Sequence, residues 1–396
     1  QIGTANLDPL FTEHSGDSDL QTNGITGQLE SIGVEVYTGH TSSNLNEGVD
    51  LVVISSAIPA DNIEVQTALA HNIPVIKRGQ MLARMVNSHL GLAVAGAHGK
   101  TTTTSMLYSA LVGSGLDPTL IVGGEIQGTE LNARLGKNDY FVVEADESDA
   151  SFLDIKPYVA IVTNIENDHL DFYESMERIQ DAFCQFLKQV APTGFALLYG
   201  GDQHVQTIIG CLSTRTLIYG EDSSFDYYLE NWKPIGMGSV FDVYYHKKYL
   251  GQIQLSIPGK HNALNALAST AAAMELGQDF NKVKEALKSF PGAKRRFQVV
   301  ASLQGITIVD DYAHHPTEIK ATIEAAKQFH QGRLIVVFQP HRYSRTKLLF
   351  EQFGESFLKA DQVVITDIYS AGEKPIVNVT GELVCQAAKN AGCNAV

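Results

Sequence analysis

The segment LGLAVAGAHGKTTTTSML, residues 90–107, decides the fold of this 396-residue chain. Its apolar half, residues 92–96, predicts a buried strand, and residues 101–113 predict a helix. The loop between them, with the pattern G-x-x-G-K-T, directs backbone N–H groups and the positive end of the helix dipole at an anion. Lys100 adds a mobile charge, and the Thr101 hydroxyl is a ligand for Mg²⁺. The segment therefore predicts a phosphate-binding loop; the alternative is a glycine-rich turn with a solvated lysine.

The rest of the chain repeats this alternation of strand and helix, which is typical of α/β proteins with mainly parallel sheets. Further strands are expected at 51–55, 140–145, 159–164, 195–199, 306–310, 334–339 and 362–366, and helices at 176–190, 263–276 and 317–328. Residues 226–254 alternate and are rich in aromatic side chains, which predicts added antiparallel strands. Breaks near 86–91 and 290–296 divide the chain into three expected domains, 1–89, 90–292 and 293–396.

Composition and charge exclude several classes of protein. The chain carries 29 Lys and Arg against 44 Asp and Glu, a net charge of −15, and general nucleic-acid binders need a basic surface instead. No apolar run approaches the ~20 residues of a membrane-spanning helix. Residues 1–19 lack the basic start and apolar core of a signal peptide. The four cysteines form no C-x-x-C pair. We therefore expect a cytoplasmic protein that binds neither nucleic acid nor membrane.

Two acidic segments follow predicted strands. EADESD begins at Glu144, and NIENDH begins at Asn164 and ends at His169. Open α/β sheets place their ligands at the carboxyl ends of the strands, and Mg²⁺ prefers oxygen ligands. Together with the phosphate loop, these segments predict a nucleotide and metal site, although each alone is equally typical of a solvated loop.

The combination of motifs resembles the Mur ligase family, the ATP-dependent amide-forming enzymes of peptidoglycan synthesis. The resemblance rests on GAHGKTTTTSML (96–107), EADESDASFL (144–153), TNIENDHLDFY (163–173), GKHNALNALA (259–268), KRRFQ (294–298), DDYAHHPTE (310–318) and FQPHRYSRT (338–346). It implies an N-terminal Rossmann-like domain for the UDP-sugar, a central P-loop ATPase domain and a C-terminal Rossmann-like domain for the amino acid. It also implies ATP and Mg²⁺ as cofactors.

Within the family, the resemblance implies that L-alanine is joined to the lactyl carboxylate of UDP-N-acetylmuramate through an acyl phosphate. Such chemistry depends on positioning and on neutralising the negative charges that meet. Two other hypotheses stay open: a recycling ligase that attaches a whole tripeptide, and a catalytically silent nucleotide-binding regulator. Ser148 and Tyr312 disfavour the tripeptide ligase, because the resemblance implies a tyrosine and a phenylalanine at these two positions in ligases of that kind.

The resemblance also assigns roles at the ATP site. The nucleotide would be held by Gly96, His98, Gly99, Lys100, Thr101, Thr102, Asn262, Asn265, Arg296 and Asp311. Thr101, Glu144 and His169 would bind metal. Asn262 and Asn265 lie three apart on one helix face and would contact adenine, although Asn262 could instead cap the helix. Lys100, Glu144, His169, Arg296 and His314 would act in catalysis.

The alanine and UDP-sugar sites are implied by further motifs. The substrate residues would be His40, Ser55, Ser56, Tyr312, His314, His341, Arg342 and Arg345. A neutral His314 could accept the proton of the incoming ammonium group. Arg345, more than Arg342, is expected to pair with the alanine carboxylate. The alternative for both arginines is a salt bridge between domains.

Overall fold

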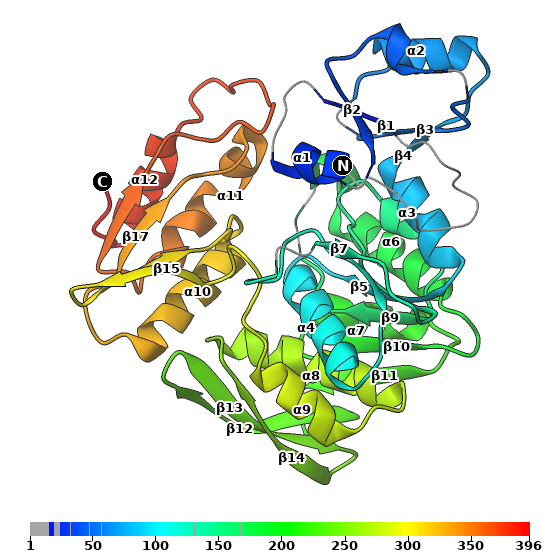
Figure 1. Ribbon diagram of the computed structural model, residues 1–396. Coiled ribbons are helices and arrows are strands. Elements are labelled where there is room, and N and C mark those ends of the chain that lie inside the picture. The colour runs from blue at the N-terminus through cyan, green and yellow to red at the C-terminus, as the bar shows by residue number, and fades with distance from the viewer. Residues whose placement is uncertain are drawn as a thin grey trace.

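The computed structural model describes residues 16–19, 24–31, 33–46, 48–56, 58–129, 132–166, 168 and 170–396. Its chain forms three successive α/β regions, coloured blue, cyan to yellow-green, and yellow to red in Figure 1. The first region has two small parallel sheets, β1–β2 and β3–β4. Its elements are β1 (Gly16–Asp19), α1 (Gly24–Ser31), β2 (Glu35–Thr38), η1 (Ser42–Asn44), β3 (Val52–Ile54), α2 (Ile63–Ala70), β4 (Val75–Lys77) and α3 (Arg78–Asn87).

The central region is built on the largest sheet, which contains ten strands among the described residues in the order β14-β13-β12-β11-β10-β9-β5-β8-β6-β7. Its elements are β5 (Leu90–Ala95), α4 (Lys100–Gly113), β6 (Thr119–Ile121), β7 (Ala133–Arg134), β8 (Tyr140–Glu144), η2 (Ser151–Asp154), β9 (Val159–Val162), α5 (Leu170–Tyr173), α6 (Met176–Lys188), β10 (Phe195–Tyr199), α7 (Gln203–Ile208), η3 (Ile209–Cys211), β11 (Thr216–Gly220), β12 (Tyr227–Ile235), β13 (Gly238–Tyr245), β14 (Lys248–Leu255), α8 (Lys260–Glu275) and α9 (Phe280–Lys288). Strands β6, β8, β5, β9, β10 and β11 run parallel, and the expected antiparallel extension is β12–β14.

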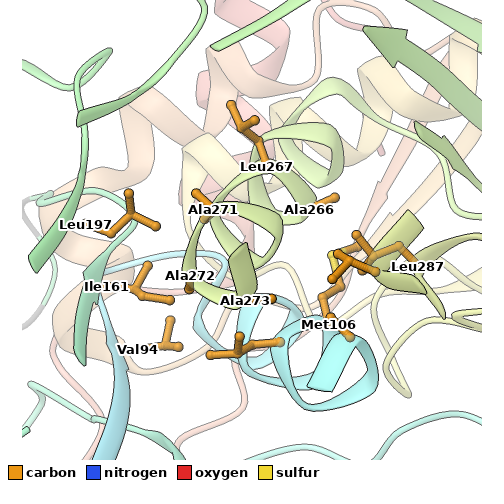
Figure 2. Close-up of a cluster of buried hydrophobic side chains, with 14 of the residues drawn as sticks. Val94, Met106, Ile161, Leu197, Ala266, Leu267, Ala271, Ala272, Ala273 and Leu287 are labelled. Atoms are coloured by element: carbon orange, nitrogen blue, oxygen red, sulfur yellow. The ribbon is translucent and has the colours of Figure 1, made fainter. Parts of the chain in front are cut away.

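Helices cover both faces of this sheet because the side chains of each central strand alternate between two buried cores. On β5, Leu92 and Val94 face the core that includes α4, α8 and α9, whereas Ala93 and Ala95 face the core that includes α3 and α6. Figure 2 shows the first core, where Ala271 and Ala272 of α8 lie on the side of Val94, Ile161 and Leu197. These small side chains let α8 pack closely on the sheet and on α4.

The third region begins with β15 (Gln298–Leu303) and β16 (Ile306–Asp310), an antiparallel pair. It continues with α10 (Pro316–Phe329), β17 (Ile335–Phe338), α11 (Tyr343–Ser356), β18 (Gln362–Ile365) and α12 (Gly381–Asn390), with β17 and β18 parallel. Figure 1 shows α10 on the side of this region that faces the central domain. The expected three-part α/β architecture is thus present.

One feature differs from the sequence expectation. Cys184 on α6 and Cys211 on η3 form a disulfide with a Cα–Cα distance of 5.8 Å, although they are 27 residues apart and share no recognisable motif. Cys385 and Cys393 are free thiols. Among the described residues, none of the helices has the length and apolar character that crossing a membrane requires.

Candidate active site

The phosphate loop joins the end of β5 to the start of α4, as the sequence predicts. Gly96 has φ 134°, and a Cβ there would lie 2.2 Å from Thr163 Oγ1. Gly99 caps α4 with φ 83°, and a Cβ there would lie 2.8 Å from Asn265 Oδ1. Both positions need glycine, because the backbone is left-handed or close to another chain segment. The loop can therefore bring its N–H groups near a phosphate.

Lys100 lies in a shell of oxygen atoms. Its Nζ donates to both carboxylate oxygens of Glu147 at 2.9 Å, to the Gly96 carbonyl at 2.7 Å and to the Ala97 carbonyl at 3.3 Å. Burial disfavours the charged amine, but the carboxylates of Glu147 and its neighbours outweigh burial and raise the pKa of Lys100. The side chain is therefore a fixed positive charge beside the loop.

Thr101 and Glu144 meet at the first turn of α4. The Thr101 hydroxyl donates to Glu144 Oε2 at 3.0 Å, and the Gly123 amide donates to the same oxygen at 2.9 Å. A hydroxyl and a carboxylate side by side next to a phosphate loop are the hard oxygen donors that Mg²⁺ prefers, so these residues fit that ion. The other predicted metal ligand, His169, lies outside the described residues.

A cavity runs from the phosphate loop to the C-terminal region. It is lined by His98, Gly99, Thr101, Thr102, Asn164, Glu166, His261, Asn262, Asn265, Arg296, Phe297, Asp311, Thr317, Glu318, Ala321 and Thr322. The structure thus brings together the predicted nucleotide residues from four motifs that are up to 213 positions apart. Gly96 and Lys100 belong to the same loop as His98 and Gly99, and Glu144 accepts a hydrogen bond from the cavity residue Thr101.

The two asparagines of α8 are both buried. Asn262 donates to the Pro258 carbonyl at 2.6 Å, and Asn265 donates to Asn262 Oδ1 at 3.3 Å. Helix α8 begins at Lys260 with Gly259 as its N-cap, so Asn262 is not the capping residue that the alternative interpretation required. Both asparagines form part of the cavity wall.

Arg296 and Asp311 approach from the C-terminal region. Arg296 pairs with Glu318 at 3.1 Å, and its guanidinium lies 5.7 Å from the centre of the Tyr312 ring. Asp311 accepts from the backbone N–H groups of Phe297 at 2.7 Å and Ala313 at 2.8 Å. Burial raises the pKa of Asp311, against the opposing effect of these hydrogen bonds. Arg296 is the cation that this region presents to the cavity.

Glu318 connects the two regions, although sequence reasoning assigned it no role. It is the N3 residue of α10 and closes a capping box with His315. Its Oε1 lies 3.3 Å from His98 Nδ1, and its Oε2 accepts from the His314 amide at 3.0 Å. Burial opposes ionisation of this carboxyl, but His98 and the neighbouring cations outweigh burial and hold its pKa well below the usual value.

His98, His315 and Thr317 also lie where the phosphate loop meets the start of α10. Burial would lower the pKa of His98, but its hydrogen bonds to Glu166 and Glu318 outweigh burial and raise it to about 9. His315 is buried, which with the charge of His98 lowers its pKa to about 4. Thr317 donates to Glu166 at 2.7 Å. The phosphate loop is thus tied to the start of α10 by polar contacts.

Three predicted alanine-site residues lie together. The Tyr312 and His314 rings are 5.0 Å apart, and the His314 and His341 rings are 5.8 Å apart. His314 Nδ1 is 2.8 Å from the Tyr312 carbonyl, which can only accept, so Nδ1 carries the proton and Nε2 has the free lone pair. Burial and the charge of Arg345 lower the pKa of His314, against the effect of Glu318. Its imidazole is therefore neutral and basic at pH 7.

Arg342 and Arg345, the two arginines predicted for the alanine site, are both in ion pairs. Arg345 is buried and pairs with Asp168 of the central region at 2.9 Å, which is the interdomain salt bridge that the sequence left open. Arg342 pairs with Glu373 within the C-terminal region at 2.6 Å.

The predicted UDP-sugar residues lie in the N-terminal region, away from these contacts. His40 Nδ1 is 2.9 Å from Glu64 Oε2 of α2, and Ser55 and Ser56 are exposed just after β3. In the described residues, no hydrogen bond, ion pair or ring contact joins these three to the cavity residues.

Several residues in or beside the cavity were not predicted from the sequence. Glu147, Glu166, His315, Thr317 and Glu318 all lie inside motifs quoted above. The H-P-T-E order of a capping box was the one local signal for Glu318 and His315. Glu147 and Glu166 had no such signal, because their partners are 47 or more positions away.

Comparison with known proteins shows where this chain has relatives. Models of the Mur ligase family match it three times: the Mur ligase family catalytic domain at residues 14–89, the Mur ligase middle domain at 94–273 and the Mur ligase glutamate ligase domain at 295–396. A UDP-N-acetylmuramate–L-alanine ligase of Syntrophomonas wolfei is 59% identical over 382 residues, covering 96% of this chain and 82% of that protein. One of Desulforamulus reducens is 46% identical, covering 98% and 84%.

Solved structures agree with these relatives. The crystal structure of the UDP-N-acetylmuramate–alanine ligase from Thermotoga maritima superposes with a TM-score of 0.80 at 28% identity, covering 96% of this chain and 83% of that one. A murein peptide ligase from Psychrobacter arcticus has a TM-score of 0.71 at 26% identity, covering 97% and 85%.

Proposed function

Because the chain belongs to the Mur ligase family, we infer that it joins L-alanine to UDP-N-acetylmuramate in peptidoglycan synthesis, with the free energy of ATP. The relatives that share 59% and 46% of its residues are named for this reaction. The three domains with the limits 1–89, 90–292 and 293–396, and the cytoplasm as the place of reaction, are part of the same proposal.

The observation that carries the proposal is the cavity between the phosphate loop and α10. Lys100 and Arg296 supply positive charge from two domains, and Asn262 and Asn265 line the same wall. We assign the phosphates of ATP to the loop and adenine to the asparagines. Thr101 and Glu144 would hold Mg²⁺, which when bound neutralises phosphate charge.

In the first step, an oxygen of the lactyl carboxylate bonds to the γ-phosphorus and the bond to the ADP oxygen breaks. Lys100 and Arg296 are placed to neutralise the charge of the moving phosphoryl group. In the second step, the amine of L-alanine attacks the acyl carbon, and phosphate leaves with the electrons of the C–O bond and with the proton that the nitrogen loses as the amide forms. His314 Nε2 takes the ammonium proton, so that a neutral amine attacks.

Phosphate release from ATP tests this function. The full chain with Mg²⁺ and UDP-N-acetylmuramate is assayed with L-alanine, glycine, L-serine or the tripeptide as the acceptor. Release that is fastest with L-alanine supports the proposal. A preference for the tripeptide would assign the chain to the recycling ligases. Nucleotide binding without any release would indicate a silent regulator.

A further inference from the structure

A second group of side chains with metal-ligand chemistry consists of residues other than Thr101 and Glu144. Three side chains converge where the phosphate loop meets α10: His98 from the loop, Glu166 from the segment after β9, and His315 before α10. His98 Nε2 and His315 Nδ1 are 3.2 Å apart, and Glu166 Oε2 is 3.4 Å from each of them. The three atoms form a nearly equilateral triangle.

These separations match one coordination geometry. An ion bound at about 2.0–2.1 Å by tetrahedral ligands holds those ligands about 3.3–3.4 Å apart. Octahedral Mg²⁺ with ligands at about 2.0–2.1 Å would require about 2.9 Å between neighbouring ligands, and it avoids imidazole nitrogen. Two nitrogens and one carboxylate oxygen are instead the donors of three-ligand Zn²⁺ sites, which leave the fourth position open.

The groups behind His98 and Glu166 have the arrangement that metal ligands need, and an ion would replace the Thr317 backbone N–H that the Nδ1 of His315 accepts at 3.4 Å. His98 Nδ1, the nitrogen that faces away from the triangle, lies 3.3 Å from Glu318 Oε1. A histidine ligand commonly donates its second N–H to such a carboxylate, which orients the ring and strengthens the ligand. Thr317 Oγ1 donates to Glu166 Oε2 at 2.7 Å and holds that carboxylate in place. The side chains of His98 and His315 are 11% and 5% exposed, so little water competes for these positions.

We propose that His98, Glu166 and His315 form a binding site for one transition-metal ion of the Zn²⁺ type, which ties the C-terminal domain to the phosphate loop. His98 and Glu166 belong to the central domain and His315 to the C-terminal domain, so the ion resists separation of the two. A proton on His98 is the competing occupant, because it can bridge the same carboxylates. The proposal does not depend on which amino acid the enzyme adds.

Titration of the full chain with Co²⁺, without nucleotide and with excess Mg²⁺, tests the site. We expect one equivalent of Co²⁺ to give the intense visible bands of tetrahedral coordination, and Zn²⁺ to abolish them. The variant His315→Asn keeps an acceptor at the N-cap of α10 but withdraws the ligand. It and Glu166→Gln should each weaken Co²⁺ binding by about 100-fold or more, in line with losses of 10–100-fold for supporting groups alone.

His330→Asn is the matched control, because His330 lies at the opposite end of the same helix. It should bind Co²⁺ as the unaltered chain does. Zn²⁺ should raise the thermal unfolding midpoint of the unaltered chain and of His330→Asn, and not that of His315→Asn. Equal midpoints of all three without metal would show that the variants fold. Absence of tetrahedral bands, or bands that persist in His315→Asn, would overturn the proposal.

Discussion

At the scale of single residues, the charge of Lys100 is set by its neighbours. Glu147 holds the amine beside the loop and keeps it protonated, so the side chain is already close to the proposed phosphate site. A bound phosphate would accept some of the Lys100 hydrogen bonds that Glu147 accepts in this structure. The residue is thus placed by the fold before any ligand arrives, which lowers the cost of ordering it.

We expect Lys100→Ala to lower the rate of ATP-dependent phosphate release by about 10²- to 10³-fold, because one charge on the moving phosphoryl group is lost. Binding of UDP-N-acetylmuramate, followed by calorimetry, should be unchanged. Lys137→Ala, at an exposed position of the same domain, is the control and should retain full activity. Substantial turnover by Lys100→Ala would remove this lysine from the reaction.

His314→Gln should lower kcat with L-alanine by about 10²-fold or more, since the amine then loses its proton acceptor. Hydroxylamine, which is largely unprotonated at pH 7, should still capture the acyl phosphate at the normal rate. Equal losses with both acceptors would show that His314 supports the structure of the site and not proton transfer.

The pKa of His341 predicts a pH dependence of stability. Burial lowers this pKa, and the adjacent His314 with the charges of Arg345 and Arg342 adds to the effect, so that it lies at about 4, whereas an unfolded histidine titrates near 6.5. Between these values the unfolded chain binds the additional proton, so stability falls as the pH drops from 6.5 to 4. The side chain is partly exposed, so solvent screening reduces the effect to on the order of 1 kcal/mol. In His341→Gln, the thermal midpoint should fall less steeply over this range.

At the scale of elements, the turn between β5 and α4 depends on backbone geometry. The backbone conformation at Gly96 would be strained with any other residue. The absence of a side chain also leaves room for Thr163 at the end of the neighbouring strand. Alanine-rich α8 similarly lets α4 and the sheet approach closely, which places Asn265 against Gly99. The loop, the helix and the strand end therefore position one another.

Gly96→Ala should lower the free energy of unfolding by about 2 kcal/mol or more and abolish ATP binding, because the Cβ overlaps Thr163 and Asn164. Gly115→Ala is the matched control. Its φ is also left-handed, at 99°, but nothing lies within 4 Å of the added Cβ. It should cost about 1 kcal/mol and leave ATP binding intact, as measured by denaturation and calorimetry.

At the scale of the whole molecule, charged contacts hold the C-terminal domain against the central one. Arg345 pairs with Asp168 where both side chains are 8% exposed. Thr317 and Glu318 of α10 contact Glu166 and His98. Because these contacts are polar, the domain arrangement responds to whatever ions or ligands enter between them.

Asp168→Asn should destabilise the chain by about 3 kcal/mol in denaturant unfolding, because it leaves the charge of Arg345 buried and uncompensated. Glu324→Gln breaks a surface pair with Lys359, whose side chain is 59% exposed, and should change stability by less than about 1 kcal/mol. Similar effects of both variants would mean that the interdomain pair does not hold the domains together.

The sequence by itself determined the α/β class, the strand–loop–helix of the phosphate site, and the bounds of the strands and helices it predicted to within a few residues. These features follow from short spacings, such as the glycines of residues 96–99, and from periodic apolar positions. The family motifs also indicated many of the polar residues that line the cavity.

Only the tertiary structure decided how these pieces meet. In the folded chain, Lys100 pairs with Glu147 and Arg345 pairs with Asp168. Cys184 forms a disulfide with Cys211, and Glu318 contacts His98 of the other domain. The physical reason is that a contact between distant residues depends on where two elements pack, and neither residue type nor local spacing records the partner. Periodicity shows which face of an element is buried, whereas the identity of the facing residue is a property of the folded chain.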